Sequence, residues 1–483
     1  MAQDLKKETT RSILWNAFDK VGFQVVAFAV GLVTLRLLSP SDFGLIGALA
    51  IFTALSNILT ESGFTSAMVR RKHNTDAEYV AVLCFNVLLG LAFYLVLFLC
   101  SGWIAEYYRM PELASLAPFL FLSIVFNSFG VVQNIVLTRN LAFKKMSIAS
   151  LISAVVSGVV TIAMIYMGYG YWSLAWQIVL QPAVRVALLW IFSDWSPRCK
   201  PDFSVIRELF TFSFSLIGSS LMNTFVRYIY NPIIGRYFGE ERLGYYSESY
   251  KFYFLPVNIV ASTFSGVAYP VLSKLNDDEP RQLNYLRKMM RMVAFCIFPV
   301  MLGAMACFDN VVEVVLTEKW MPIVPYFRVL AIAGLVAPMH TMYLNLMVVR
   351  GFPKKNFLLE VIRNALTLLF LFVFHDTIEQ MLWGFVAANL LSYVVDLFFV
   401  REVVRYSIRE QLWDVFPYLC ISCFMAGLVF LIDWLDWSAM VKLIAQLMTG
   451  VAAYVLPAKM LGSNVLNDVI AAVSKKDQSS DSH

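Results

Sequence analysis

Six ionisable residues lie inside long apolar stretches of this sequence, and they are the residues best placed to do chemistry. A charge at mid-membrane costs about 2.5 to 3.5 kcal/mol on insertion scales, so such a residue usually has a function and a partner. The six are Asp19, Lys20, Glu61, Arg185, Arg227 and Arg363. Four of them are cationic, and lysine and arginine bind anionic oxygen atoms through charge-assisted hydrogen bonds. The excess of cations therefore favours a cavity that accepts an anion.

The depth of each cation follows from its position along its predicted span. Lys20, Arg185 and Arg363 lie about six to eight residues from the inner end, which at about 1.5 Å per residue is roughly 10 Å. Arg227 lies about 18 residues along its span and therefore in the outer half. We expect an anion entering from inside to meet the three inner cations first and Arg227 later. A structural interpretation stays open, in which Lys20 only neutralises Glu61 and Arg185 and Arg363 extend to the lipid headgroups.

The elements that position these residues are predicted to be transmembrane helices. Hydrophobic residues make up 59% of the 483 residues and charged residues 15%, with a mean hydropathy of +0.68. Soluble domains carry about 25% charged residues. Spanning strands would alternate over about 10 residues, whereas the apolar windows here are twice as long, so the fold class is all-α. About fourteen spans of some 20 residues are expected. They are 12–37, 43–69, 79–101, 115–138, 147–167, 171–193, 209–235, 251–273, 289–312, 325–349, 357–375, 380–400, 415–433 and 439–461.

The basic residues between the spans predict the orientation of the chain. Alternate segments, including the two termini, hold 26 lysines and arginines, and the opposite segments hold 8. Cytoplasmic loops carry the excess of basic residues in membrane proteins. We therefore predict a multi-pass protein in the cell membrane with both termini in the cytoplasm. No basic block typical of nucleic-acid binding occurs, and the histidines lack metal-ligand spacing. Cys420 and Cys423 have CxxC spacing, but they lie in an apolar span with no histidine nearby, which argues against a metal site.

The sequence also contains a repeat. A shift of 200 residues places the segment from Arg36 to Gly44 on the segment from Arg236 to Gly244 without a gap, and each segment lies at an outer turn between two long spans. Parallel repeats of this kind are typical of transporters, whose substrate site lies between the repeats. We predict a six-helix lobe over 1–200 and a second over 201–400. Residues 401–483 would add an amphipathic link, two further helices and a polar tail.

Two segments carry a resemblance to a known family. Residues 35–72, which begin LRLLSPSDFG, and residues 235–278, which begin GRYFGEERLG, resemble the paired hairpin signatures of bacterial polysaccharide transporters, the lipid-linked oligosaccharide flippases of the multidrug, oligosaccharidyl-lipid and polysaccharide exporter superfamily. The resemblance implies two six-helix bundles in a V, often with two extra C-terminal helices. It also implies alternating access and movement of an undecaprenyl-diphosphate-linked sugar repeat unit to the outer leaflet for lipopolysaccharide, capsule or exopolysaccharide assembly.

In this context the four cations, Lys20, Arg185, Arg227 and Arg363, are predicted to bind the substrate diphosphate. Asp19 and Glu61 are the carboxylates predicted to couple transport to a proton or sodium gradient. Because no nucleotide-binding GxxxxGK[ST] motif occurs, we expect no ATP hydrolysis and no cofactor, and we interpret the chain as a transporter and not as an enzyme.

Three other interpretations remain open at this point. A multidrug or cation antiporter of the same superfamily would favour a cavity rich in carboxylates, against which the excess of cations argues. A membrane-embedded polysaccharide polymerase would need a sizeable outer loop, and the predicted outer loops are short. A lipid-anchoring scaffold without transport activity would share the same composition. A polysaccharide polymerase is also a possible partner of a flippase.

Overall fold

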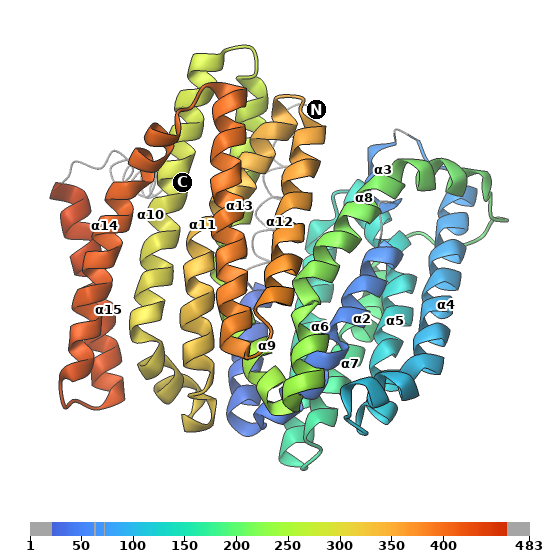
Figure 1. The fold of residues 1–483 in the computed structure, drawn as a ribbon. Coiled ribbons are helices and arrows are strands. Elements are labelled where there is room, and N and C mark those ends of the chain that lie inside the picture. Colours follow the sequence, from blue (N-terminus) through green and yellow to red (C-terminus); the bar gives the residue numbers. More distant parts are fainter. Residues whose placement is uncertain (1–21, 62–63, 72, 461–483) are drawn as a thin grey trace, which may run out of the picture. The chain divides into compact units, whose positions relative to one another are not determined.

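The computed structural model describes residues 22–61, 64–71 and 73–460, and Figure 1 shows them as helices joined by short turns. Asp19 and Lys20, both predicted to be functional, lie outside the described residues. The described residues form α-helices and short π and 3-10 helices, and they contain no strand. This confirms the all-α class. Twelve helices within these ranges are long and apolar enough to cross a membrane. A thirteenth, shorter apolar helix, Gly22–Leu37, covers the described part of the first predicted span. The total of fourteen stays a prediction.

The chain divides into two compact units, Met1–Ser247 and Glu248–His483. The helices of the N-terminal unit after Gly22–Leu37 are α2 (Pro40–Glu61), α3 (Phe64–Arg70), α4 (Asp76–Tyr108), α5 (Leu113–Arg139), α6 (Phe143–Tyr166), α7 (Tyr171–Phe192) and α8 (Ser204–Tyr228). Helix α5 packs against α2, α4 and α7, and α6 packs against α7. Small residues permit this packing, since a Cβ atom on Gly90 of α4 would lie 2.8 Å from Ser128 of α5.

Helix α9 (Tyr230–Lys274) runs from the N-terminal into the C-terminal unit. It is two helices joined at Gly239, whose φ of 86° is accessible to glycine without strain. The predicted spans 209–235 and 251–273 therefore follow each other across this turn with almost no loop between them. After Gly239 the chain is helical again about ten residues before the predicted start at residue 251. One glycine replaces the longer outer loop that the polar residues after it suggested.

The C-terminal unit contains α10 (Glu279–Val311), the short helices Val312–Leu316 and Glu318–Trp320, α11 (Ile323–Val349), α12 (Pro353–Val373), α13 (Ile378–Val404), α14 (Ile408–Leu431), the short helix Ile432–Trp434 and α15 (Ala439–Met460). Helix α10 packs against α11, α14 and α15, and α13 packs against α11 and α12. Figure 1 shows these helices, yellow to red, side by side. The segment 401–416, predicted to be an amphipathic link, consists of the end of α13 and the first turns of α14.

Local sequence signals set several helix ends. The Thr75 side chain accepts a hydrogen bond from the Glu78 N–H, and the Glu78 carboxylate accepts one from the Thr75 N–H, which forms a capping box at the start of α4. Ser407 and Glu410 repeat this arrangement at the start of α14. Near its N-terminus α14 is also fixed to α10, because Asp414 accepts hydrogen bonds from Arg287 at 2.7 Å and from Arg291 at 3.0 Å.

Candidate functional site

Arg363 lies in the middle of the C-terminal unit. It is the eleventh residue of α12, is partly buried, and interacts electrostatically with Glu360 on the same helix and with Asp396 of α13. Tyr250 and Tyr253 of α9 are its other electrostatic neighbours. A guanidinium inside an apolar helix bundle is therefore accompanied by carboxylates and not only by lipid, which is how intramembrane charges are usually stabilised.

A buried histidine–carboxylate pair lies beside Arg363. His340 Nδ1 of α11 is 2.5 Å from Asp396 Oδ2 of α13, and the two side chains are 5% and 0% exposed. Neither His340 Nε2 nor Asp396 Oδ1 has a hydrogen-bond partner among the described residues. Asp396 also interacts electrostatically with Arg363. The three residues thus form one ionisable cluster on three helices.

Sequence reasoning overlooked this cluster, although a signal was present. Asp396 is a single carboxylate in an otherwise apolar part of the predicted span 380–400, and the rule for intramembrane charges that selected Arg363 applies to it equally. His340 has no partner at a local ligand spacing, since Asp396 is 56 residues away along the chain. Only the packing of α11 on α13 brings the two together.

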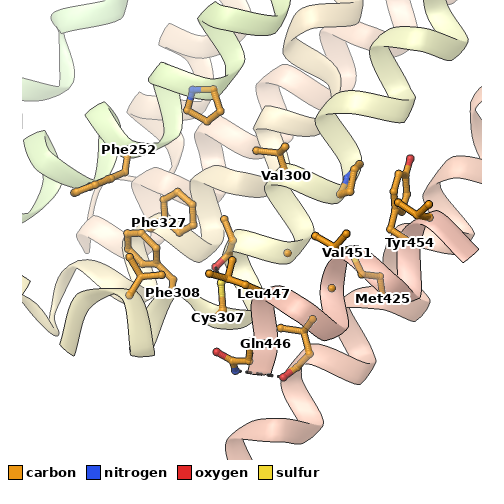
Figure 2. A pocket seen from close by; sticks show the side chains of 18 residues that line it. Phe252, Val300, Cys307, Phe308, Phe327, Met425, Gln446, Leu447, Val451 and Tyr454 are labelled. Carbon is orange, nitrogen blue, oxygen red and sulfur yellow. Dashed lines mark hydrogen bonds between the residues drawn. The ribbon is translucent and has the colours of Figure 1, made fainter. Parts of the chain in front are cut away.

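An apolar cavity of about 530 Å³ lies in the same unit, between α9, α10, α11, α14 and α15. Figure 2 shows the Phe252, Phe308 and Phe327 rings at one side of the cavity and Val451 and Tyr454 of α15 at the other. The side-chain amide of Gln446 is held by hydrogen bonds to Asn310 and Asp433 and to the Val429 carbonyl. The lining is therefore chemically suited to a hydrocarbon chain and poorly suited to a sugar or a phosphate.

Arg185 occupies a different environment in the N-terminal unit. It is half-buried on α7, and its guanidinium donates to Asn134 Oδ1 of α5 at 3.2 Å and to Ser150 Oγ of α6 at 3.4 Å. These partners are neutral, so they orient the guanidinium without removing its charge. Asn134 and Ser150 were not selected from the sequence, because polar residues without charge are common in spanning helices.

The remaining predicted site residues lie at helix ends. Arg227 is the second-to-last residue of α8 and has an exposed side chain. Glu61 is the last residue of α2. The structure thus distributes Arg185, Arg227 and Arg363 over three helices and both units, and titratable groups surround Arg363.

The two repeated turns contact each other within the N-terminal unit. A Cβ atom on Gly44 would lie 1.8 Å from the Glu240 carbonyl oxygen, and one on Gly244 would lie 1.9 Å from the Pro40 carbonyl oxygen. Residue 240 corresponds to residue 40 under the 200-residue shift, so the contact is reciprocal. Two copies related by a twofold axis make contacts of this kind. Glycine is required at both positions because the backbones touch.

Arg236, in the second turn, stabilises the end of α4. Its guanidinium donates to the carbonyl oxygens of Glu106, at 3.1 Å, and of Tyr107, in the last turn of that helix. Carbonyl groups at a helix C-terminus lack partners in the helix, and arginine side chains commonly supply them. Arg36, its counterpart in the first turn, has an exposed side chain.

The fold is that of a multi-pass membrane transporter. An inward-closed structure of the lipid II flippase MurJ aligns with a TM-score of 0.75 at 15% sequence identity, over 93% of this chain and 99% of that one. At this identity the similarity shows a shared fold.

The polysaccharide biosynthesis protein family matches residues 33–325, more than half of the chain, and the chain belongs to this family. The succinoglycan biosynthesis transport protein ExoT of Rhizobium meliloti (strain 1021) is 27% identical over 336 residues, which are 69% of this chain and 68% of ExoT. The lipopolysaccharide biosynthesis protein WzxC of Escherichia coli (strain K12) is 25% identical over 342 residues, 69% of this chain and 68% of WzxC. The resemblance of residues 35–72 and 235–278 to bacterial polysaccharide transporters is confirmed.

Proposed function

We propose that this protein is a flippase that moves undecaprenyl-diphosphate-linked oligosaccharide repeat units from the inner to the outer leaflet of a bacterial cell membrane, by alternating access, for surface polysaccharide assembly. The observation that carries the proposal is membership of the polysaccharide biosynthesis family, whose relative ExoT is named as a transport protein. A fold shared with a lipid II flippase supports it.

The two chemically different regions of the C-terminal unit suit the two parts of such a substrate. The cavity bounded by α14 and α15 is lined by aliphatic and aromatic side chains and would hold part of the isoprenoid chain. Arg363 would contribute charge-assisted hydrogen bonds to diphosphate oxygens. Arg185 and Arg227, in the N-terminal unit, would bind the same group at other stages of transport, as would Lys20.

The finer features of the proposal come from the sequence. The excess of 26 over 8 basic residues supports cytoplasmic termini and an inner-membrane location. Coupling to a proton or sodium gradient would supply energy, because one charge crossing the membrane gains about 2.3 kcal/mol per 100 mV. Asp19 and Glu61 are proposed as coupling carboxylates on the sequence alone. A polysaccharide polymerase would consume the flipped repeat unit outside.

The proposal is tested by reconstituting the full chain in liposomes that contain a fluorescent undecaprenyl-diphosphate oligosaccharide. A membrane-impermeant quencher then reports the fraction of lipid that has changed leaflet. We expect flipping by the wild type and an approximately tenfold slower rate for Arg227→Ala. Arg281→Ala is the control, because this arginine is 78% exposed at the start of α10. A wild-type rate equal to that of empty liposomes would refute the proposed function.

A further inference from the structure

The His340–Asp396 pair has unfilled capacity for one proton. A separation of 2.5 Å between Nδ1 and Oδ2 requires a proton between these two atoms. When that proton is on the imidazole, Nε2 is left as an acceptor and the carboxylate keeps Oδ1 as a second acceptor. Both atoms are buried and have no hydrogen-bond partner among the described residues. A buried acceptor without a donor destabilises the protein, and a proton added at either atom would remove part of this cost.

The surroundings of the pair determine what an added proton would change. Arg363 of α12 is the charged group that interacts with Asp396, and Glu360 in turn interacts with Arg363. Tyr343 of α11 and Tyr393 of α13 are the uncharged titratable neighbours of Asp396. With one shared proton, the pair carries a single negative charge opposite the Arg363 guanidinium. A second proton would make the pair neutral and leave the Arg363 charge without that counter-charge.

On the other helices packed against the pair, the charged groups nearest to it in the part of the chain that the structure describes are paired with one another. Tyr406, in the turn before α14, interacts with Tyr343 and Tyr393. Beyond it, Asp414 of α14 accepts hydrogen bonds from Arg287 at 2.7 Å and from Arg291 of α10 at 3.0 Å. Arg287 also pairs with Glu410 at 3.2 Å, so two arginines and two carboxylates balance in charge. Arg363 and Glu360 therefore remain the charges that proton uptake at the pair would affect.

The three residues also lie at one depth. His340 is nine residues from the end of α11 at Val349, Arg363 is ten residues from the start of α12 at Pro353, and Asp396 is eight residues from the end of α13 at Val404. At about 1.5 Å per residue, each lies roughly 12 to 15 Å from the same end of its helix bundle. A change of charge on His340 or Asp396 therefore changes the electrostatic energy of Arg363 strongly, because the interior has a low dielectric constant.

We propose that the His340–Asp396 pair is a proton-binding site whose occupancy is linked to the binding of an anionic diphosphate at Arg363. The step is a simple protonation: a proton from water forms an N–H or O–H bond at the pair, and no other bond changes. Because linkage is reciprocal, diphosphate binding promotes proton uptake and proton uptake promotes diphosphate binding. This inference rests on the proposed function for its ligand, and it adds a proton-binding group in the C-terminal unit to the coupling carboxylates that the sequence predicts at Asp19 and Glu61.

The first experiment uses the ligand-free full chain in detergent and needs no transport. Infrared difference spectra between pH 8 and pH 5 report protonation of carboxyl and imidazole groups. We expect a transition in the wild type that is absent from Asp396→Asn and His340→Gln. His375→Gln is the control, because His375 faces Asp376 at 3.9 Å in an exposed pair. Wild-type spectra that match those of Asp396→Asn would overturn the proton site whatever the substrate is.

The second experiment measures the linkage with farnesyl diphosphate as the probe. Calorimetric titrations in buffers of different ionisation enthalpy give the number of protons taken up on binding. We expect the wild type and His375→Gln to take up a fraction of one proton more than Asp396→Asn or Arg363→Gln does. Relative to Asp396→Asn, which corrects for protonation of the probe itself, the wild type should bind about fivefold tighter at pH 6 than at pH 8.

The outcomes separate the two proposals. Binding of farnesyl diphosphate without proton uptake would overturn the linkage and leave the flippase proposal intact. Absence of binding at every pH, together with absent flipping in liposomes, would refute the flippase proposal, while the infrared result would still decide whether the pair binds a proton. Melting temperatures of all variants, measured in parallel, identify any variant that has lost its fold.

Discussion

The guanidinium groups of Arg185 and Arg363 have different neighbours in the two units. In the N-terminal unit, Arg185 donates to a neutral amide and a neutral hydroxyl, Asn134 and Ser150. In the C-terminal unit, Arg363 lies among Glu360, Asp396 and tyrosines. Neutral partners fix a guanidinium in one geometry at every pH, whereas carboxylate neighbours make its environment depend on protonation. The comparison suggests that binding and ion coupling are unequally divided between the units.

The N-terminal unit is also distinguished by direct backbone contact between its two repeated turns, and disrupting that contact should have the largest effect. We expect Gly44→Ala to destabilise the protein by about 3 kcal/mol or more, because the new Cβ would lie 1.8 Å from a backbone carbonyl oxygen that cannot move independently. Thermal unfolding in detergent measures the change.

Gly31→Ala is the matched control for this substitution. No atom lies within 4 Å of a Cβ built at Gly31, which is also in a helix. Alanine there should stabilise the helix by about 0.5 to 1 kcal/mol. Equal melting temperatures for Gly44→Ala and Gly31→Ala would show that the turns do not touch in the folded protein.

The contrast between the two arginines is sharpest in the pH dependence of flipping. We expect Arg363→Gln and Arg185→Gln each to slow flipping about tenfold, the loss expected for one charge-assisted contact of about 1.4 kcal/mol. Only Arg363→Gln should also flatten the rate between pH 6 and pH 8, since Arg185 has neutral hydrogen-bond partners. Identical pH profiles for the two variants would remove the distinction between the units.

The apolar cavity provides a third comparison between the units. Val300 of α10 lines the cavity, and we expect Val300→Trp to slow flipping about threefold to tenfold by occupying space meant for an isoprenoid chain. Val155 of α6 has the same exposure, 46%, but belongs to the N-terminal unit. Val155→Trp should leave the rate within about twofold. An equal loss in both variants would point to a general effect of tryptophan on membrane insertion.

The smallest effect is expected at the ion pair between Arg71, directly after α3, and Glu208 of α8. Arg71 bridges Glu78 at 2.9 Å and Glu208 at 2.6 Å, and Glu208 is 67% exposed. Because exposed pairs contribute about 1 kcal/mol or less, Glu208→Gln should lower the free energy of unfolding by no more than that. The loss should shrink further in high salt. A larger loss that persists in high salt would indicate that this surface is covered in the folded protein.

Helix positions were predictable, but the predicted helix starts miss the capped polar first turns by up to about ten residues. The start of α4 at Asp76 precedes the predicted residue 79 because the capping box at Thr75 extends the helix beyond its apolar part. Helix α14 begins at Ile408 and not at 415 for the same reason, since Ser407 and Glu410 cap a polar first turn. Hydropathy alone marks the apolar region of a helix and omits its polar ends.

The candidate site was only partly predictable. Arg363 and Arg185 were identified because a lone charge in an apolar window is conspicuous. Their partners were not, because Asn134, Ser150 and His340 are ordinary residues until the helices pack. Asp396 could have been identified from its position in a predicted span, but its pairing with a histidine could not.

The sequence by itself determined the membrane class, the helical fold, the approximate spans and the 200-residue register of the repeated turns. These properties depend on local hydropathy, on charge counts and on matching residue types, all of which are written along the chain. The tertiary structure alone decided which polar groups meet: the reciprocal contact of Gly44 and Gly244 with opposite backbones, the neutral partners of Arg185 and the pairing of His340 with Asp396. Such contacts depend on the rotation and depth of each helix against its neighbours, and apolar helices of similar composition leave both undetermined until they pack.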